Sequence, residues 1–210
     1  MTISSAVLHT FYILNELSQN PREDLLYYFE KLFFYAKQSW VQIMDIKLRI
    51  DELKNSKAEQ DRRECIPLLE HYLKSHPDDV QSWYDLAGCF DYCGLEKEAE
   101  PCYWKTYELG WKKLPAQEQP GFFVGFGSTL RNNLKLDQSE MVLKVALEHF
   151  PTYPALKAFL ALTQYSKGQF QECAQTLFAA QAEMPANAYD GYENAIKWYV
   201  ENLETYPPRS

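Results

Sequence analysis

The chain has 210 residues, of which 46% are apolar and 15% aromatic, and its formal net charge is −8. This amount of large apolar surface excludes a disordered chain, and the negative charge disfavours binding to nucleic acid or to anionic membranes. Only 8 glycines occur, none of them before Gly88, which disfavours a β-sandwich. We expect one ordinary domain or a short array of repeats with a substantial core.

The first 60 residues are predicted to form helices, either as divergent repeats or as a separate appendage. Asn20 and Pro21 are typical of a helix start, and one earlier helix is expected before them. No glycine or proline occurs from Arg22 to Ile66, so the break between the following helices has to lie among polar residues. The almost wholly polar stretch Lys54–Glu64 is the expected turn.

Prolines recur downstream at a fixed distance. Pro67 and Pro101 lie 34 positions apart, and so do Pro151 and Pro185. Pro77 and Pro151 lie 74 positions apart, which is two periods of 34 plus an insertion of six, and the irregular stretch 110–121 is the expected place of that insertion. Pro67 and Pro101 are expected in the first turn of a helix, where a missing amide costs little. A period of 34 residues is typical of an array of helix–turn–helix units.

Three successive segments carry small and aromatic residues at matching offsets. The clearest unit has Trp83, Leu86, Ala87, Phe90, Gly94, Ala99 and Tyr103. The next has Phe123, Phe126, Gly127, Leu130, Leu143, Ala146 and Pro151, and the third has Leu160, Ala161, Gly168, Leu177, Ala180 and Pro185. At these positions the chain resembles the tetratricopeptide repeat (TPR) family.

The resemblance implies an all-α fold, a right-handed superhelical α-solenoid of TPR-like helix–turn–helix hairpins. The hairpins are expected over residues 61–187, an N-terminal helical extension over residues 1–60, and a C-terminal capping helix with its tail over residues 188–210. A capping helix is expected because the end of a solenoid exposes an apolar face.

Helix boundaries are also predicted from local residue types. Asp78 and Asp79 are expected to cap the helix that follows them. Gly94 and Gly168 suit the left-handed residue that ends the first helix of a hairpin. Leu134 stands where the second hairpin should have glycine, so the turn is expected to shift to Asn133, which tolerates a left-handed conformation.

The resemblance also implies a binding surface. In the family the first helix of each unit lines a concave face on which peptides or partner helices lie. Carrying the family's positions onto this chain, with the C-terminal helix added, predicts a partner-binding groove formed by Tyr84, Asp91, Tyr92, Ser128, Arg131, Asn132, Tyr165 and Tyr192. The alternative for each tyrosine is that it packs between neighbouring helices.

No catalytic constellation is recognisable in the sequence. The glycine-rich run from Gly121 to Gly127 lacks the Lys and Ser/Thr of a phosphate-binding loop, and close helix packing around Gly127 is the better interpretation. The five cysteines have no spacing typical of a metal site, and buried cysteine behaving as a small hydrophobe is the simpler reading. We therefore expect no catalytic residues, no metal and no cofactor.

The sequence thus predicts a non-enzymatic interaction module or scaffold that binds a peptide or helix of a partner protein. The absence of a leader and of an apolar run long enough for a membrane span predicts a cytoplasmic protein with reduced thiols and no membrane or nucleic-acid partner. The alternative is a regulatory or sensor protein of the same family whose N-terminal helices are an effector arm. That alternative predicts a loose junction at Lys54–Glu64 which proteases cut first.

Overall fold

The computed structural model describes residues 44–182 together with residues 33, 37, 191, 192, 194, 195 and 198. The chain divides into two compact units, Met1–Pro77 and Asp78–Ser210, and each is described by itself. Within the described residues every regular element is helical and there is no strand. The prediction of an all-α helical repeat is confirmed. The predicted helix start at Asn20 and the helix before it lie outside the described residues.

In the first unit, a helix that includes residues 44–53 packs against α3 (Glu59–Ser75). The first of these helices buries Ile50 and Leu53, and α3 buries Cys65 and Leu69. The Cys65 thiol lies 3.8 Å from the carbonyl oxygen of Ile50. The turn between the helices is shorter than the predicted Lys54–Glu64, because α3 already begins at Glu59.

Hydrogen bonds around Ser56 hold this turn. The Ser56 hydroxyl donates to Asp61, the Arg62 Nε donates to the Ser56 carbonyl at 2.9 Å, and the Ala58 amide donates to the Ser56 Oγ at 3.1 Å. A turn with both backbone and side-chain bonds opens less readily than one without them. These bonds therefore count against the loose junction that an effector arm would need.

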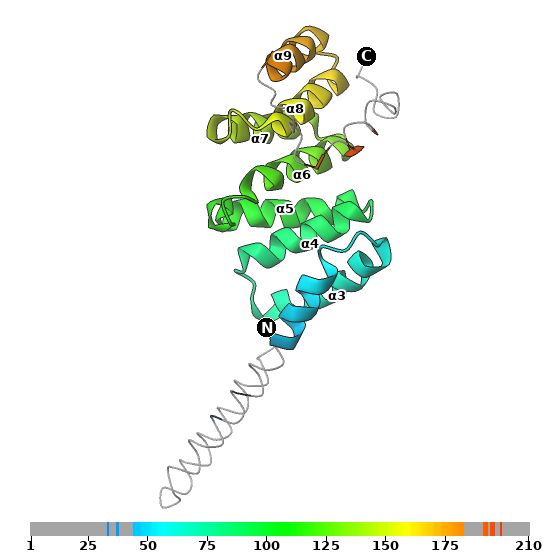
Figure 1. Ribbon diagram of the computed structural model, residues 1–210, viewed down its shortest axis with the longest axis vertical. Helices are drawn as coiled ribbons and strands as arrows, with labels where there is room; N and C mark the ends of the chain where they lie inside the picture. Colours follow the sequence, from blue (N-terminus) through cyan, green and yellow to red (C-terminus); the bar gives the residue numbers. More distant parts are fainter. Residues whose placement is uncertain are drawn as a thin grey trace, which may run out of the picture. The chain divides into compact units, whose positions relative to one another are not determined.

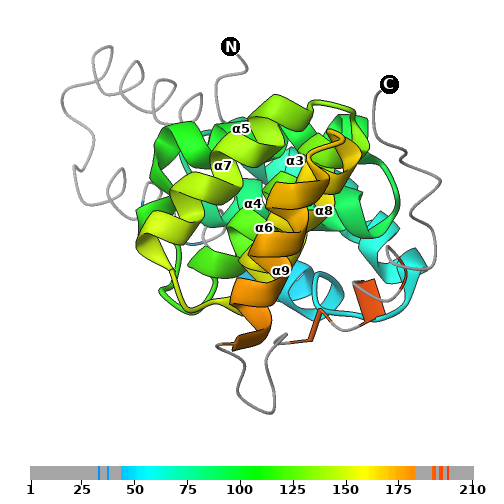
Figure 2. The same cartoon turned by 90° about the horizontal axis from the view of Figure 1, so that it is seen from above.

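The second unit contains three helix–turn–helix hairpins. They are α4 (Val80–Tyr92) with α5 (Glu96–Gly110), α6 (Gln119–Asn132) with α7 (Leu136–His149), and α8 (Pro154–Ser166) with α9 (Phe170–Ala182). The hairpins stack in chain order, with α5 packed against α6 and α7 against α8 (Figure 1). Seen from above, α9 lies in front of the other helices of this unit (Figure 2).

The insertion between the first two hairpins folds back onto the stack. It contains a 3₁₀ turn, η1 (Trp111–Lys113), whose Trp111 ring packs edge-on against Phe123 at a centroid distance of 4.9 Å. The Gln119 side chain donates to the Leu114 carbonyl at 2.9 Å, and Leu114 itself is buried. The extra residues thus cover one end of α6 and add to its core.

Aromatic residues fill the space between the first and second hairpins. Phe122, Phe123 and Phe126 of α6 are all fully buried, and the Tyr103 ring of α5 stacks on Phe126 at a centroid distance of 5.7 Å. Fully burying a phenylalanine contributes roughly 1.5–3 kcal/mol. These rings join successive hairpins into one continuous interior.

Several helix boundaries follow the sequence. Asp79 caps α4, because its Oδ1 accepts a hydrogen bond from the Ser82 amide at 3.2 Å. Gly94 and Gly168 have φ values of +67° and +77° at the turns inside the first and third hairpins. The predicted shift to Asn133 is wrong, however: Leu134 itself takes the left-handed conformation, with φ of +61°.

The two prolines of the first pair also differ from expectation. Pro67 is the ninth residue of α3 and Pro101 the sixth residue of α5, so neither lies in a first turn. A proline inside a helix removes one backbone hydrogen bond and strains the preceding turn. Both helices nevertheless bury residues on either side of the proline, including Cys65 and Leu69 around Pro67, and this packing outweighs the local cost.

We expect Leu134→Gly to raise the free energy of unfolding by about 0.5–1 kcal/mol. A left-handed L-residue costs roughly 1–2 kcal/mol, which exceeds the roughly 0.4–1 kcal/mol that glycine loses through its freedom in the unfolded chain. The Leu134 side chain is 57% exposed, so little apolar burial is lost. Urea unfolding measures the change. Leu134→Ala is the control, because it shortens the side chain but keeps the Cβ, and an equal gain there would refute strain as the cause.

The last helix leaves apolar side chains in contact with solvent. Leu177 of α9 is 46% exposed, whereas the equivalent repeat positions of the earlier hairpins, Tyr103 and Leu143, are 2% and 0% exposed. Phe170 and Phe178 are exposed on the same helix. The predicted cap over residues 188–210 lies mostly outside the described residues and stays a prediction.

Candidate interaction surface

The first helices of the three hairpins lie side by side, because α6 packs against both α4 and α8. We call the surface that they share the first-helix side and define it by Tyr84 and Asp91 of α4, Gly121 and Gly125 of α6, and Phe159 of α8. Most of the residues that the sequence assigned to a partner lie on these three helices. What each of them contacts decides what it can offer to a ligand.

Three tyrosines meet on the first-helix side. The rings of Tyr84 and Tyr103 are 6.4 Å apart, and Phe122 lies 5.8 Å from the first and 6.0 Å from the second. Burial raises the pKa of both Tyr84 and Tyr103, and the nearby Tyr192 raises each further. Both hydroxyls are therefore neutral at physiological pH, and a neutral phenol can donate and accept hydrogen bonds.

Two glycines of α6 make room for these hydroxyls. A Cβ at Gly121 would lie 3.1 Å from the Tyr192 hydroxyl and 3.5 Å from the Tyr84 hydroxyl. A Cβ at Gly125 would collide with the Tyr103 hydroxyl. The glycine-rich run, which the sequence analysis assigned to close helix packing, thus admits tyrosine side chains as well.

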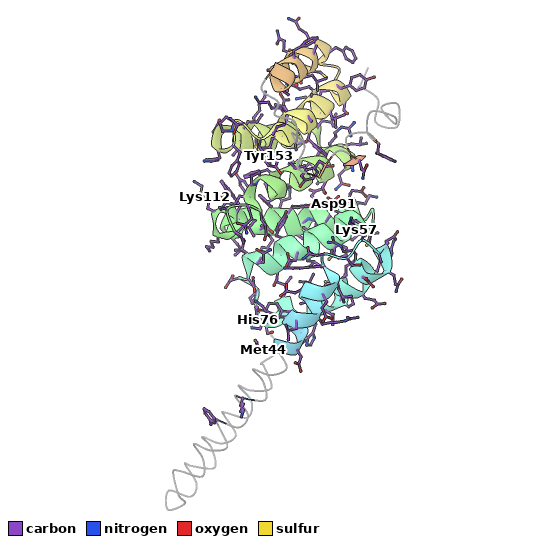
Figure 3. The ribbon with its side chains drawn as sticks, viewed as in Figure 1. Met44, Lys57, His76, Asp91, Lys112 and Tyr153 are labelled. Carbon is purple, nitrogen blue, oxygen red and sulfur yellow. The ribbon has the colours of Figure 1, made fainter. Side chains whose placement is uncertain are left out.

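Asp91, labelled in Figure 3, has both carboxylate oxygens engaged within the fold. Oδ1 accepts from the Thr129 hydroxyl at 3.2 Å and Oδ2 from the Tyr103 hydroxyl at 3.3 Å. Burial raises the pKa of Asp91 to about 7, and the negative Glu96 raises it too, although the two hydrogen bonds oppose the rise. The residue therefore links α4, α5 and α6 through a carboxyl group that changes charge near neutral pH.

Arg131 and its neighbours tie the hairpins together. The Arg131 side chain is 1% exposed, and its Nε donates to the Leu162 carbonyl at 3.2 Å and to the Ser166 hydroxyl at 2.9 Å. Asn132 donates to Glu96 at 3.4 Å, and Ser128 is buried. Ser128 and Arg131 of the predicted groove lie inside the packed structure and Asn132 is half-buried, and the role of all three toward a partner stays a prediction.

The remaining predicted residues lie at the ends of their helices. Tyr92 is the last residue of α4 and is 48% exposed. Tyr165 is half-buried, and its ring packs edge-on against Phe170 at 5.5 Å. The structure therefore brings Tyr84, Asp91 and Tyr192 to one cluster, and it places Tyr92 and Tyr165 at the C-terminal ends of α4 and α8.

The sequence did not point to three residues that form or adjoin this cluster, namely Tyr103, Gly121 and Phe159. Tyr103 was assigned only to the repeat's aromatic core position, Gly121 only to a glycine-rich run, and Phe159 to no role. The spacing of Gly121 and Gly125, one helical turn apart, was the available signal, since it places two gaps on one side of a helix. Nothing in the spacing of Phe159 distinguishes it from an ordinary core residue.

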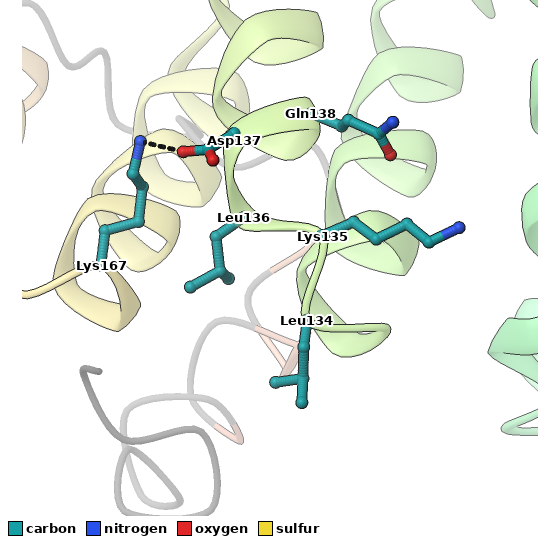
Figure 4. Close-up of a pocket in the computed structure, with 6 residues that line it drawn as sticks. All are labelled: Leu134, Lys135, Leu136, Asp137, Gln138 and Lys167. Carbon is teal, nitrogen blue, oxygen red and sulfur yellow. Dashed lines mark ion pairs between the residues drawn. The ribbon is translucent and has the colours of Figure 1, made fainter. Parts of the chain in front are cut away.

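A cavity of about 490 Å³ opens at the turns of the second and third hairpins, away from the tyrosine cluster. Figure 4 shows Lys167 directed at Asp137, with a distance of 2.8 Å between Nζ and Oδ1, while Lys135 points away from both. The lining is completed by Leu134, Leu136 and Gln138.

The lysines of this cavity already neutralise carboxylates. Lys167 also pairs with Glu140, and Lys135 pairs with Glu100, so the second helix of one hairpin binds the turn of the next in the same manner twice. Burial alone would raise the pKa of Glu140, but Lys144 and Lys167 hold it below its ordinary value. The cavity is explained by contacts between hairpins, and we assign no ligand to it.

Within the described part of the chain, no group of three or more His, Cys, Asp or Glu side chains is placed to hold a metal ion. Among the same residues, no helix has the length and apolar character that crossing a bilayer requires.

The model of a protein family described as "Tetratrico peptide repeat" matches residues 80–203, which is more than half of the chain. The matched region begins at the first residue of α4 and contains all three hairpins of the second unit. A comparison with curated proteins finds no match. The family match and the observed order of helices agree.

Proposed function

We propose that this chain, which belongs to the tetratricopeptide repeat family, binds a peptide segment or helix of a partner protein on its first-helix side. Tetratricopeptide repeats generally mediate interactions between proteins. The observation that carries the proposal is the cluster of Tyr84, Tyr103 and Tyr192 beside two glycines of α6. Tyrosine provides large contact area and a hydrogen-bonding group at small entropic cost.

The proposed role is that of a scaffold without catalysis. Burial raises the pKa of Asp91 to about 7, and a carboxyl group with a pKa so strongly raised is a candidate for acid–base chemistry. Both of its oxygens accept hydrogen bonds from the protein's own hydroxyls, which supports a structural role. We also propose a cytoplasmic location, since none of the five cysteines, all of them among the described residues, forms a disulfide bond.

Replacing Tyr92 by alanine should weaken binding of the partner about tenfold and leave the melting temperature unchanged. Tyr92 is exposed at the end of a first helix, so the variant loses contact area without losing core packing. The partner is identified by affinity purification with the wild-type chain, and its affinity is then measured with purified proteins by calorimetry.

Met141→Ala is the matched control. Met141 is exposed to a similar extent, 47%, but lies on the second helix α7. The proposal expects this variant to bind like the wild type. Equal weakening by both substitutions would contradict a binding surface on the first helices.

A further inference from the structure

We propose that the place between Gly121 and Phe159 is a subsite for an unmodified tyrosine side chain, and that Tyr192 fills it until a partner segment carrying a tyrosine displaces it. The inference rests on the proposed function, because it names the chemistry that the first-helix side recognises. It also assigns an occupant to that surface within the chain itself.

The position of Tyr192 is that of a ligand lying across the first helices. Its ring packs edge-on against Phe159 of α8, with centroids 6.0 Å apart and an interplanar angle of 77°. Its hydroxyl reaches Gly121 of α6, where an added Cβ would be 3.1 Å away, and comes close to the Tyr84 hydroxyl of α4. One side chain therefore packs on α8, reaches α6 and lies near the Tyr84 hydroxyl of α4.

Tyr192 follows α9 in the chain but contacts earlier helices. In a stack of hairpins, the segment that follows α9 would be expected to pack on α9 and cover its outward residues. Tyr192 instead contacts α8 and α6, which precede α9 in the chain, and Phe178 of α9 is 72% exposed. Contact with α8 is of the kind that neighbouring first helices make, as α6 and α8 do, but the reach to Gly121 of α6 extends one hairpin further. The Tyr192 side chain therefore lies where a partner's side chain would lie on the first-helix side.

The surroundings select tyrosine over its relatives. Gly121 leaves space for one hydroxyl, and the neutral Tyr84 hydroxyl beside it can pair with another hydroxyl. Glu118 and Asp85 add negative charge near Tyr84. A phosphorylated tyrosine brings close to two further negative charges at neutral pH, so these carboxylates would repel it.

The test uses the full chain and a synthetic peptide with the sequence of residues 186–200. The Tyr192→Ala chain, whose subsite is vacated, should bind the labelled peptide at least tenfold more tightly than the wild-type chain does. The same peptide with alanine or phosphotyrosine at position 192 should lose this binding, and phenylalanine there should retain only part of it. Fluorescence anisotropy measures each affinity.

A second substitution locates the subsite. The double variant Tyr192→Ala/Gly121→Val fills the space with a side chain and should no longer bind the peptide, while Tyr192→Ala/Gly88→Ala should bind it fully, because a Cβ at Gly88 meets nothing within 4 Å. Melting temperatures show whether each variant is folded.

Either of two results would overturn the proposal: equal peptide affinity for wild-type and Tyr192→Ala chains, or equal affinity for the tyrosine and alanine peptides. These outcomes are separable from a failure of the proposed function. If the peptide affinities are equal but Tyr92→Ala still weakens partner binding, the tyrosine subsite is refuted and the proposed function stands. If the peptide binds as expected while Tyr92→Ala has no effect, the subsite stands and the proposed surface does not extend to Tyr92.

Discussion

Gly127→Ala should lower the free energy of unfolding by about 1 kcal/mol, although alanine is the better helix former. A Cβ at Gly127 would lie 2.6–2.9 Å from three side-chain carbons of Leu143, which is completely buried. Leu143 cannot move away without displacing the interior between α6 and α7, and overpacking of this kind costs roughly 1–3 kcal/mol. Alanine gains about 1 kcal/mol in helix propensity over glycine, and this gain offsets only part of the overpacking cost.

Gly88→Ala provides the contrast within the same repeat architecture. Gly88 lies inside α4, and an added Cβ there meets no heavy atom within 4 Å. This variant should gain about 0.5–1 kcal/mol from helix propensity. Urea unfolding of both variants checks the pair, and equal shifts would show that the close approach of α6 to α7 is not what requires glycine at position 127.

Asp91 should make the protein less stable as the pH rises toward neutrality. The ordinary pKa of the side chain is 3.8, and burial raises it to about 7 in the folded state. Because the folded-state pKa is the higher one, the folded state binds the proton more tightly, and stability falls between about pH 4 and pH 7. The full slope is about 1.36 kcal/mol per pH unit, and it halves at the folded-state pKa, so the loss from pH 5.5 to pH 7 is about 1.5 kcal/mol.

Asp91→Asn should remove this dependence, because an amide does not ionise and still fits between Thr129 and Tyr103. Urea unfolding at pH 5.5, 7 and 8 should therefore show the variant gaining on the wild type mainly between pH 5.5 and pH 7, with a smaller further gain by pH 8 as the carboxyl group completes its ionisation. The exposed Asp78→Asn is the control and should follow the wild type. Parallel curves for Asp91→Asn and wild type would mean that Asp91 is ionised in the folded protein at pH 5.5.

Much of the hairpin array could be predicted from the sequence, because helix pairs need small residues where they approach and large ones between them. Gly127 against Leu143 and the aromatic core around Phe126 are direct consequences of that requirement. Pro101 was misplaced, since local rules measure the cost of an interior proline but not the packing that compensates it. The left-handed residue of the second hairpin was also predicted wrongly, as Asn133 in place of Leu134. The packed hairpin keeps the turn at Leu134, although a left-handed conformation is unfavourable for leucine.

The candidate surface was less predictable than the fold. Family positions place residues on a helix but do not show which neighbours cover them, and Arg131 is buried by contacts with α8 that its own segment does not reveal. The contact of Tyr192 with Phe159 joins residues 33 positions apart, close to one repeat period, but the reach of its hydroxyl to Gly121 spans 71 positions, and the period does not predict it. Such contacts depend on where the chain returns after the repeats.

Hydrogen–deuterium exchange of the chain with and without its purified partner tests the central claim most directly. If the first-helix side binds the partner, protection should increase in α4, α6 and α8 around Tyr84, Gly121 and Phe159, and residues near Tyr192 should exchange faster as they are displaced. Protection confined to α5, α7 and the outward residues of α9, with the first helices unchanged, would contradict the account.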